Sequence, residues 1–108
     1  MAKYLVLFRL KGETVRRFME NPGDRSQAVE ELIAQVGGKL ECYYFTFGQY
    51  DGMVILEAPD SASIAATSVA VTGSGAFSHF ETHELISSQD MVGILQRAKE
   101  MSYRPPGA

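Results

Sequence analysis

The chain has 108 residues, of which 45% are hydrophobic and 21% charged; this is typical of one globular domain with its own core and excludes a disordered chain. The net charge of −3 gives no electrostatic reason to bind nucleic acid or an anionic membrane. The single cysteine, Cys42, excludes an internal disulfide and a thiolate metal site, and no apolar run approaches the roughly 18 residues that span a bilayer.

The first forty residues predict one strand and two helices. Alternating apolar residues over Lys3–Leu10 predict the strand. A helical spacing of apolar residues over Gly12–Glu20 predicts the first helix. Asp24 is expected to cap the second helix, with Gln27 reaching back as in a capping box, and Gly37–Gly38 ends that helix.

The middle of the chain predicts a hairpin, a helix and a fourth strand. The aromatic-rich Leu40–Phe47 and the apolar Tyr50–Glu57 are separated by a short turn, so these two strands must be antiparallel. In that turn, Gly48 is expected to supply a positive φ. A helix of small residues follows, capped by Asp60 or Ser61 and ending near residue 71, and the fourth strand covers residues 77–86.

The order of these elements predicts the fold class. Ser87 and Asp90 form a capping-box pattern before a last helix. The resulting β-α-β-β-α-β order is that of an α+β, ferredoxin-like domain, in which a four-stranded antiparallel sheet carries its helices on one face. We therefore predict one domain over residues 1–100 with an added C-terminal helix, and a flexible tail over residues 101–108.

The second face of the predicted sheet raises the question of assembly. Strands one and three are apolar on both sides, whereas a sheet with one wet face alternates apolar and polar residues. Four such strands present a bare face on the order of 400 Å². We expect a second subunit to cover this face, sheet against sheet, in a homodimer or a higher homo-oligomer. Cover by the C-terminal helix alone is the alternative.

Three segments carry a family resemblance: KYLVLFRL, GGKLECYYFTFGQYDGMVILEAPD and FETHEL. Together they resemble the GYD-domain family, a small bacterial family named for a Gly-x-Tyr-Asp signature that Gly48, Tyr50 and Asp51 match. The resemblance covers residues 3 to 100 and also rests on Leu40, Tyr44, Thr46, Glu57, Ala58, Pro59, Glu81 and Thr82. It implies a subunit of the dimeric α+β barrel type and carries over no catalytic residues. His79 and His83 depart from the usual family pattern.

Asp51 and its neighbours have two interpretations. Asp51 is either a general base or ligand acceptor, or a structural acceptor of backbone N–H groups across the hairpin loop. Tyr50 should point to the opposite face of the strand. Arg9 could pair with Asp51 or with an anionic ligand, or form a surface salt bridge. Tyr44 and Tyr50 belong to an aromatic set that lines either an apolar ligand cavity or the core and interface.

His79, Glu81 and His83 share one face of the fourth strand because side chains alternate with a period of two. The two histidines are about 13.5 Å apart along the strand, too far for both to bind one metal at about 2.1 Å. They are candidates for acid–base catalysis or ligand contact. The alternative is a hydrogen-bonded polar row. We expect neither a metal site nor a cofactor.

Three functions fit these residues. The first is an oligomeric domain that binds a small apolar or aromatic molecule in a cavity between sheets or between sheet and helices. The second is a cofactor-free enzyme, monooxygenase-like or isomerase-like, in which His79, His83 or Asp51 moves protons. The third is a ligand-sensing regulatory module. The N-terminal residues read as a first strand without a signal-peptide cleavage site, so a cytoplasmic location is expected.

Overall fold

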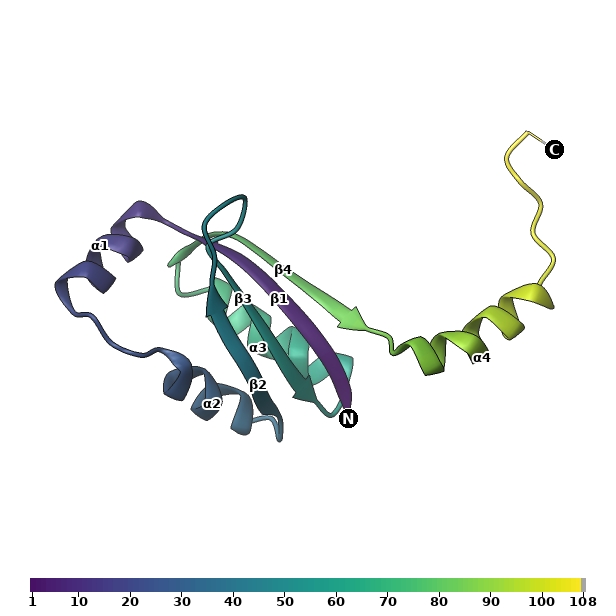
Figure 1. Ribbon diagram of the computed structural model, residues 1–108, viewed down its shortest axis with the longest axis horizontal. Coiled ribbons are helices and arrows are strands. Elements are labelled where there is room, and N and C mark those ends of the chain that lie inside the picture. Colours follow the sequence, from purple (N-terminus) through teal and green to yellow (C-terminus); the bar gives the residue numbers. More distant parts are fainter. Residues whose placement is uncertain (108) are drawn as a thin grey trace.

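The computed structural model describes residues 1–107 (Figure 1). Every predicted strand and helix is present, and its ends lie within two residues of the prediction. In chain order the elements are β1 (Ala2–Leu10), α1 (Gly12–Glu20), α2 (Ser26–Ala34), β2 (Lys39–Phe45), β3 (Gly52–Ala58), α3 (Ser61–Thr72), β4 (Phe77–Leu85) and α4 (Ser88–Lys99).

The four strands form one antiparallel sheet in the order β2-β3-β1-β4. This order is the ferredoxin-like arrangement, so the predicted fold class is confirmed. Two interruptions of the register occur. One lies between Arg9 and Leu10 on β1, and the other between Leu40 and Cys42 on the edge strand β2.

The core lies between the sheet and the helices α2 and α3. Alternate residues of β1 and β3 point to this helix side, which is why their burial alternates strictly along each strand. Ile33 of α2 and Ile64 of α3 pack against these strand residues and complete the core on the helix side. The buried strand residues are Tyr4, Val6, Phe8, Val54, Leu56 and Ala58.

The β2–β3 turn differs from the prediction. Among the described residues, only Gly37, Gly75 and Gly107 have positive φ, so the expectation for Gly48 is wrong. Six residues, 46–51, join the strands, and a connection of this length does not need the left-handed conformation of a two-residue turn. Thr46 closes the loop instead: its N–H donates to the carbonyl of Asp51 (2.9 Å) and its hydroxyl to the carbonyl of Tyr50 (2.6 Å).

Helix capping follows the prediction at α3 and α4 but not at α2. Asp60 caps α3, and the Ser87 hydroxyl of α4 accepts from the N–H of Asp90 (3.0 Å). The predicted capping box at α2 is wrong. The N-cap position of α2 is Arg25, one residue after Asp24. Asp24 accepts a hydrogen bond from the N–H of Ser26, and the side chain of Gln27 donates to Glu31 (3.2 Å) and not back to Asp24.

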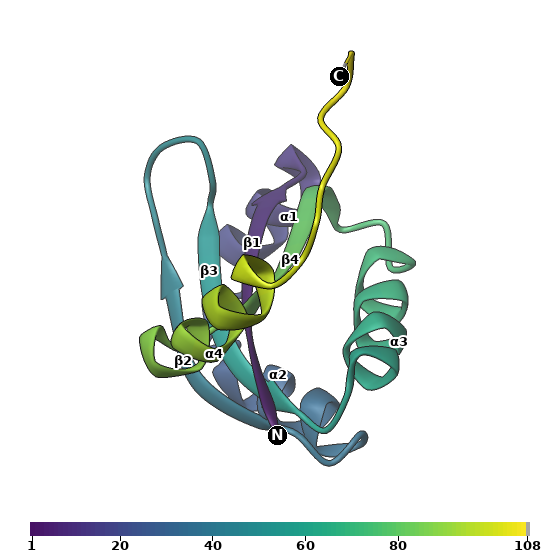
Figure 2. The ribbon, with the colours of Figure 1, turned by 90° about the vertical axis from the view of Figure 1, so that its right-hand side faces the viewer.

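The face of the sheet opposite the helices, which we call the open face, has no cover within residues 1–107. Its centre is formed by the half-buried Leu5, Leu7, Met53 and Ile55. The alternative cover, α4, projects away from the sheet and buries none of its residues (Figure 1). Figure 2 looks along this projection, so α4 lies in front of the sheet there. The backbone of Ser87 is extended, so the chain runs onward from β4 without reversing. The alternative prediction, that the C-terminal helix covers the open face of its own chain, is therefore wrong.

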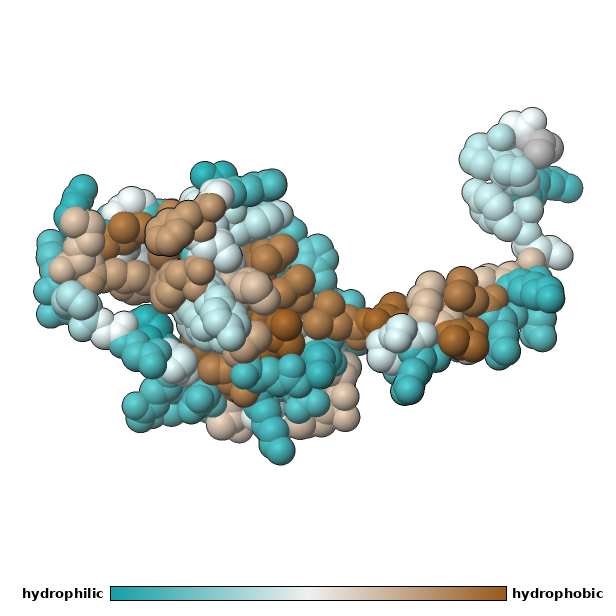
Figure 3. Space-filling model, viewed as in Figure 1, coloured by the Kyte–Doolittle hydropathy of each residue, from teal (hydrophilic) through white to brown (hydrophobic). Residues whose placement is uncertain are grey.

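The chain is consequently elongated, with extents of 57 × 34 × 23 Å. Apolar side chains on α4 stand apart from the body of the molecule (Figure 3). Beyond α4, residues 101–107 form neither helix nor strand; the last position of the predicted tail, Ala108, lies outside the described residues. In the part of the chain that the structure describes, every helix is too short or too polar to cross a bilayer.

Candidate functional site

A hydrogen-bonded group of four side chains lies on the open face, and we call it the Glu81 cluster: Tyr50, His79, Glu81 and His83. The carboxylate of Glu81 lies between the two histidines, 2.6 Å from His79 Nε2 and 2.8 Å from His83 Nε2. The hydroxyl of Tyr50 donates to the same carboxylate at 2.7 Å. The structure thus brings Tyr50 onto the polar row that the sequence predicts along β4.

These contacts fix the charge of Glu81. The hydrogen bond from Tyr50 is the largest cause, followed by those from His79 and His83, and together they lower the pKa of Glu81 from 4.5 to about 2. The same bond to Glu81 raises the pKa of Tyr50. Glu81 is therefore a fixed anion near neutral pH, and any proton transfer within the cluster would use the imidazole rings.

A Tyr50→Phe substitution tests this arrangement. Because the bond from Tyr50 stabilises the charged carboxylate, its loss should raise the pKa of Glu81 from about 2 toward 4.5. The folded-state pKa of Glu81 is depressed, so its contribution to stability is present above pH 4.5 and is lost as the pH falls through about 2. The carboxyl carbon of Glu81 should report this shift in an NMR titration.

Tyr44→Phe is the matched control for that titration. Tyr44 shares the open face but lies on β2, at the opposite edge of the sheet from β4. Its substitution should leave the Glu81 titration unchanged. Equal pKa values for Glu81 in the wild type and in Tyr50→Phe would contradict the hydrogen-bond assignment.

Asp51 does not join the Glu81 cluster. Its carboxylate accepts from the N–H of Leu10 at 2.7 Å, and its own N–H donates to the carbonyl of Phe8 at 2.8 Å. These bonds tie the hairpin loop to β1 where the β1–β4 register shifts. Asp51 is therefore a structural acceptor of a backbone N–H group, as one of the two interpretations predicts. The donor, however, belongs to β1 and not to the hairpin loop. The structure brings His79 and His83 together through Glu81 but leaves Asp51 apart.

Arg9 and Asp51, which the sequence suggested as a pair, line two different hollows. Arg9 is opposite His79 in the β1–β4 register, and both line an open polar hollow of about 420 Å³ with Gln49, Tyr50 and Ser78. Asp51 lines a different hollow, beside Phe18 and Phe45. Among residues 1–107, the ion pairs do not include one between Arg9 and Asp51.

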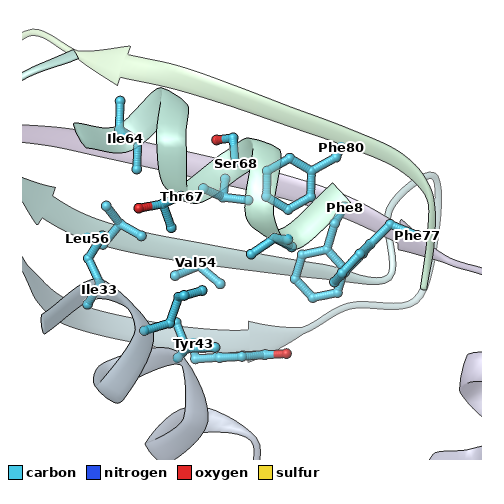
Figure 4. Close-up of a pocket in the computed structure, with 14 residues that line it drawn as sticks. Phe8, Ile33, Tyr43, Val54, Leu56, Ile64, Thr67, Ser68, Phe77 and Phe80 are labelled. Atoms are coloured by element: carbon cyan, nitrogen blue, oxygen red, sulfur yellow. The ribbon is translucent and has the colours of Figure 1, made fainter. Parts of the chain in front are cut away.

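A second candidate site lies on the helix side of the sheet (Figure 4). This inner cavity has a volume of about 70 Å³ and is enclosed by all four strands together with α2 and α3. The hydroxyl of Thr67 bonds to the carbonyl of Ser63 (2.9 Å) and Ser68 to Thr82 (3.2 Å), so these polar atoms are already occupied. Its lining is Val6, Phe8, Val29, Leu32, Ile33, Tyr43, Val54, Leu56, Ile64, Thr67, Ser68, Val71, Phe77 and Phe80.

An outer hollow of about 320 Å³ beneath α1 adjoins the inner cavity. The two share five lining residues: Val29, Leu32, Tyr43, Val71 and Phe77. Arg25 and Thr14 line the outer hollow. Burial raises the pKa of Tyr43; the charge of Arg25 opposes that shift and the charge of Asp24 adds to it. The apolar inner cavity thus adjoins a hollow that Arg25 lines.

Sequence reasoning named Phe8 and Tyr43 of this space but missed Phe77, Phe80 and the helical side. Tyr44 and Tyr50, which one interpretation assigns to an apolar ligand cavity, line neither the inner cavity nor the outer hollow. Arg25, Thr67 and Val71 carry no motif, and only the run of small residues in α3 indicates that a helix leaves room above the sheet. Metal binding gains no support: within residues 1–107, no group of three or more His, Cys, Asp and Glu side chains is placed to hold a metal ion.

Several solved structures share the fold of this chain. The crystal structure of FFRP-DM1 has 17% identity and a TM-score of 0.52, covering 80% of this chain and 100% of that one. A hypothetical protein, PHS023, from Pyrococcus horikoshii has 13% identity and a TM-score of 0.50, covering 82% and 93%. An uncharacterized NIPSNAP domain protein from Burkholderia xenovorans has 15% identity and a TM-score of 0.50, covering 82% and 95%.

These likenesses establish the fold alone, which is the ferredoxin-like fold seen in the sheet order. No curated protein matches the sequence. The model of the GYD domain matches residues 4–95, which span both Tyr50 and Glu81. The chain therefore belongs to the GYD-domain family.

Proposed function

We propose that this GYD domain is a homo-oligomeric small-molecule-binding protein whose ligand, a small apolar or aromatic molecule, occupies the space between the sheet and the helices. The observation that carries the proposal is that the inner cavity and the outer hollow adjoin and share five lining residues. Ligand sites of this kind are mostly apolar and have few polar groups that fix orientation. Arg25 and the Tyr43 hydroxyl are suited to that role.

The size of the inner cavity restricts the ligand. A dry cavity of about 150 Å³ accepts benzene, whereas the inner cavity measures about 70 Å³. An aromatic ring cannot therefore fit there alone, and a ligand would have to extend into the outer hollow. We expect an elongated molecule with its apolar end against Phe8 and Phe77 and a polar or anionic end near Arg25.

The proposal can be tested with the fluorescent probe 1-anilinonaphthalene-8-sulfonate, which joins aromatic rings to an anion. Val71 lines both the inner cavity and the outer hollow, so Val71→Phe should fill their junction and weaken probe binding by about tenfold, or ~1.4 kcal/mol. Fluorescence titration measures the dissociation constant.

Val69→Phe is the matched control. Val69 belongs to the same helix but is 71% exposed, so the same substitution there should leave probe affinity unchanged. Identical affinities in the wild type and both variants would place the probe elsewhere and remove the support for this site.

Association through the open face is the second part of the proposal. Leu5, Leu7, Met53 and Ile55 form an apolar centre on this face, and patches of this kind mark interaction surfaces. The dimeric α+β barrel fold type also favours two sheets packed face to face. Sedimentation at micromolar concentration should give a species of at least twice the 11.9 kDa chain mass. A monomer would refute this part of the proposal.

A cofactor-free enzyme, monooxygenase-like or isomerase-like, is the second candidate function. The observation that favours it is the Glu81 cluster, in which one anion orients two imidazole rings beside the hollow that Arg9 lines. In this scheme His79, which lines the hollow, would move protons and Glu81 would position it. Asp51 has no part in this scheme because it lines a different hollow from His79.

NMR distinguishes the two candidate functions. Titration of the protein with a small aromatic acid should shift the ring signals of Phe77 and Tyr43 if the ligand enters the helix-side space. Shifts confined to the ring protons of His79 would instead favour the enzyme. The two outcomes involve opposite faces of the sheet, so they cannot be confused.

A further inference from the structure

Helix α4 is separated from the rest of its own chain. None of its residues is buried, and it extends beyond the end of β4 without returning to the sheet (Figure 1). The radius of gyration is 17.4 Å, whereas a compact domain of this length has a radius of about 13 Å. The projection of α4 and of the segment that follows it contributes to this excess (Figure 1).

This isolated helix carries an apolar stripe. Met91, Ile94 and Leu95 are spaced as neighbours on one side of a helix, and they are 38%, 40% and 57% exposed. Gln89 and Gln96 lie on the opposite side of the helix. A 12-residue helix is marginal in water without tertiary contacts. The stripe therefore needs an apolar partner surface to keep α4 folded.

We propose that α4 of each subunit packs on a second copy of this chain, as an exchanged arm. This inference rests on the homo-oligomer of the proposed function. Two open faces of about 400 Å² each bury about 800 Å² in total, which is below the ~1,000 Å² expected of a stable interface. The arm is about 18 Å long and about 10 Å wide. Each of the two reciprocal contacts buries surface on the arm and on the partner, which raises the total buried area to about 1,500 Å², within the standard range.

Charge also favours a second copy as the partner. Helix α4 contains Asp90, Arg97 and Lys99 and so carries a charge of +1. The whole chain carries −3, which leaves −4 on the remainder. A cationic arm is thus attracted to the anionic body of another copy, and this complementarity steers the encounter.

The experiment compares two double variants that introduce identical charge. Ile94→Glu with Leu95→Glu disrupts the apolar stripe, and Gln89→Glu with Gln96→Glu places two carboxylates on the opposite side of the same helix. Both pairs are exposed, so the body of the domain should fold in each. The stripe variant should raise the dimer dissociation constant at least about tenfold in sedimentation equilibrium, and the control should not.

Isotope-filtered NMR on a mixed dimer of labelled and unlabelled chains identifies the subunit that α4 contacts. Cross-peaks from the labelled Ile94 methyl group to protons of the unlabelled copy would support the exchanged arm. Cross-peaks only within the labelled chain, or a stripe variant as tightly dimeric as the control, would overturn the arm while leaving the sheet-to-sheet dimer intact. A monomeric wild-type protein would overturn both the exchanged arm and the sheet-to-sheet dimer.

Discussion

A Gly52→Val variant should lose about 3 kcal/mol of unfolding free energy. A Cβ atom at position 52 would overlap the ring of Phe8, whose Cε atoms would lie 2.7 and 2.9 Å away. The ring cannot move aside, because Phe8 is 3% exposed and packs edge-on against Tyr43 and Phe77. Urea denaturation monitored by circular dichroism would measure the loss.

Gly48→Ala provides the comparison for that variant. A Cβ at position 48 meets no atom within 4 Å, and the φ angle of Gly48 is not positive. The substitution should therefore change the unfolding free energy by less than about 0.5 kcal/mol. If Gly48→Ala were as costly as Gly52→Val, steric contact with Phe8 would not be the reason.

An Asp51→Ala variant should lose about 2 kcal/mol of unfolding free energy. The substitution removes the 2.7 Å acceptor of the Leu10 N–H, a charged partner in a partly buried position, and the donor is left unsatisfied. Unfolding free energies from denaturant titration, together with faster hydrogen exchange at the Leu10 amide, would measure this effect.

Asp51→Asn separates the hydrogen bond from the charge. The amide oxygen can still accept from Leu10, so this variant should keep most of the stability that Asp51→Ala loses. A stable Asp51→Ala protein with impaired ligand binding would instead return Asp51 to the list of functional residues.

The strands and their faces could be predicted because burial on one side of a strand leaves a period of two in the sequence. Tyr4, Val6 and Phe8 are all buried on the helix side of β1. Tyr50 and Asp51 do point apart, to Glu81 and to Leu10 respectively, but they precede β3, which begins at Gly52. Alternation continued back from Gly52 would turn Tyr50 to the helix side, so the loop and not the period of two sets the directions of this pair.

The contacts between distant segments could not be predicted in this way. Tyr50 and Glu81 are 31 residues apart, and no local pattern indicates that the hairpin loop reaches β4. The direction of α4 depends on the backbone of Ser87, which a capping motif leaves undefined. Likewise, the inner cavity is a space left between helices and sheet, so only packing in three dimensions reveals it.

The interrupted register of β2 has a consequence for how copies can add to one another. An edge strand with a regular ladder invites another strand and thus fibrillar growth. In β2 the register shifts beside Glu41, and the carboxylate of Glu41 reaches Lys3 at 2.9 Å. An irregular, charged edge of this kind is a poor template for strand addition. The β2 edge should therefore resist strand addition, which disfavours fibrillar growth of the sheet through this edge.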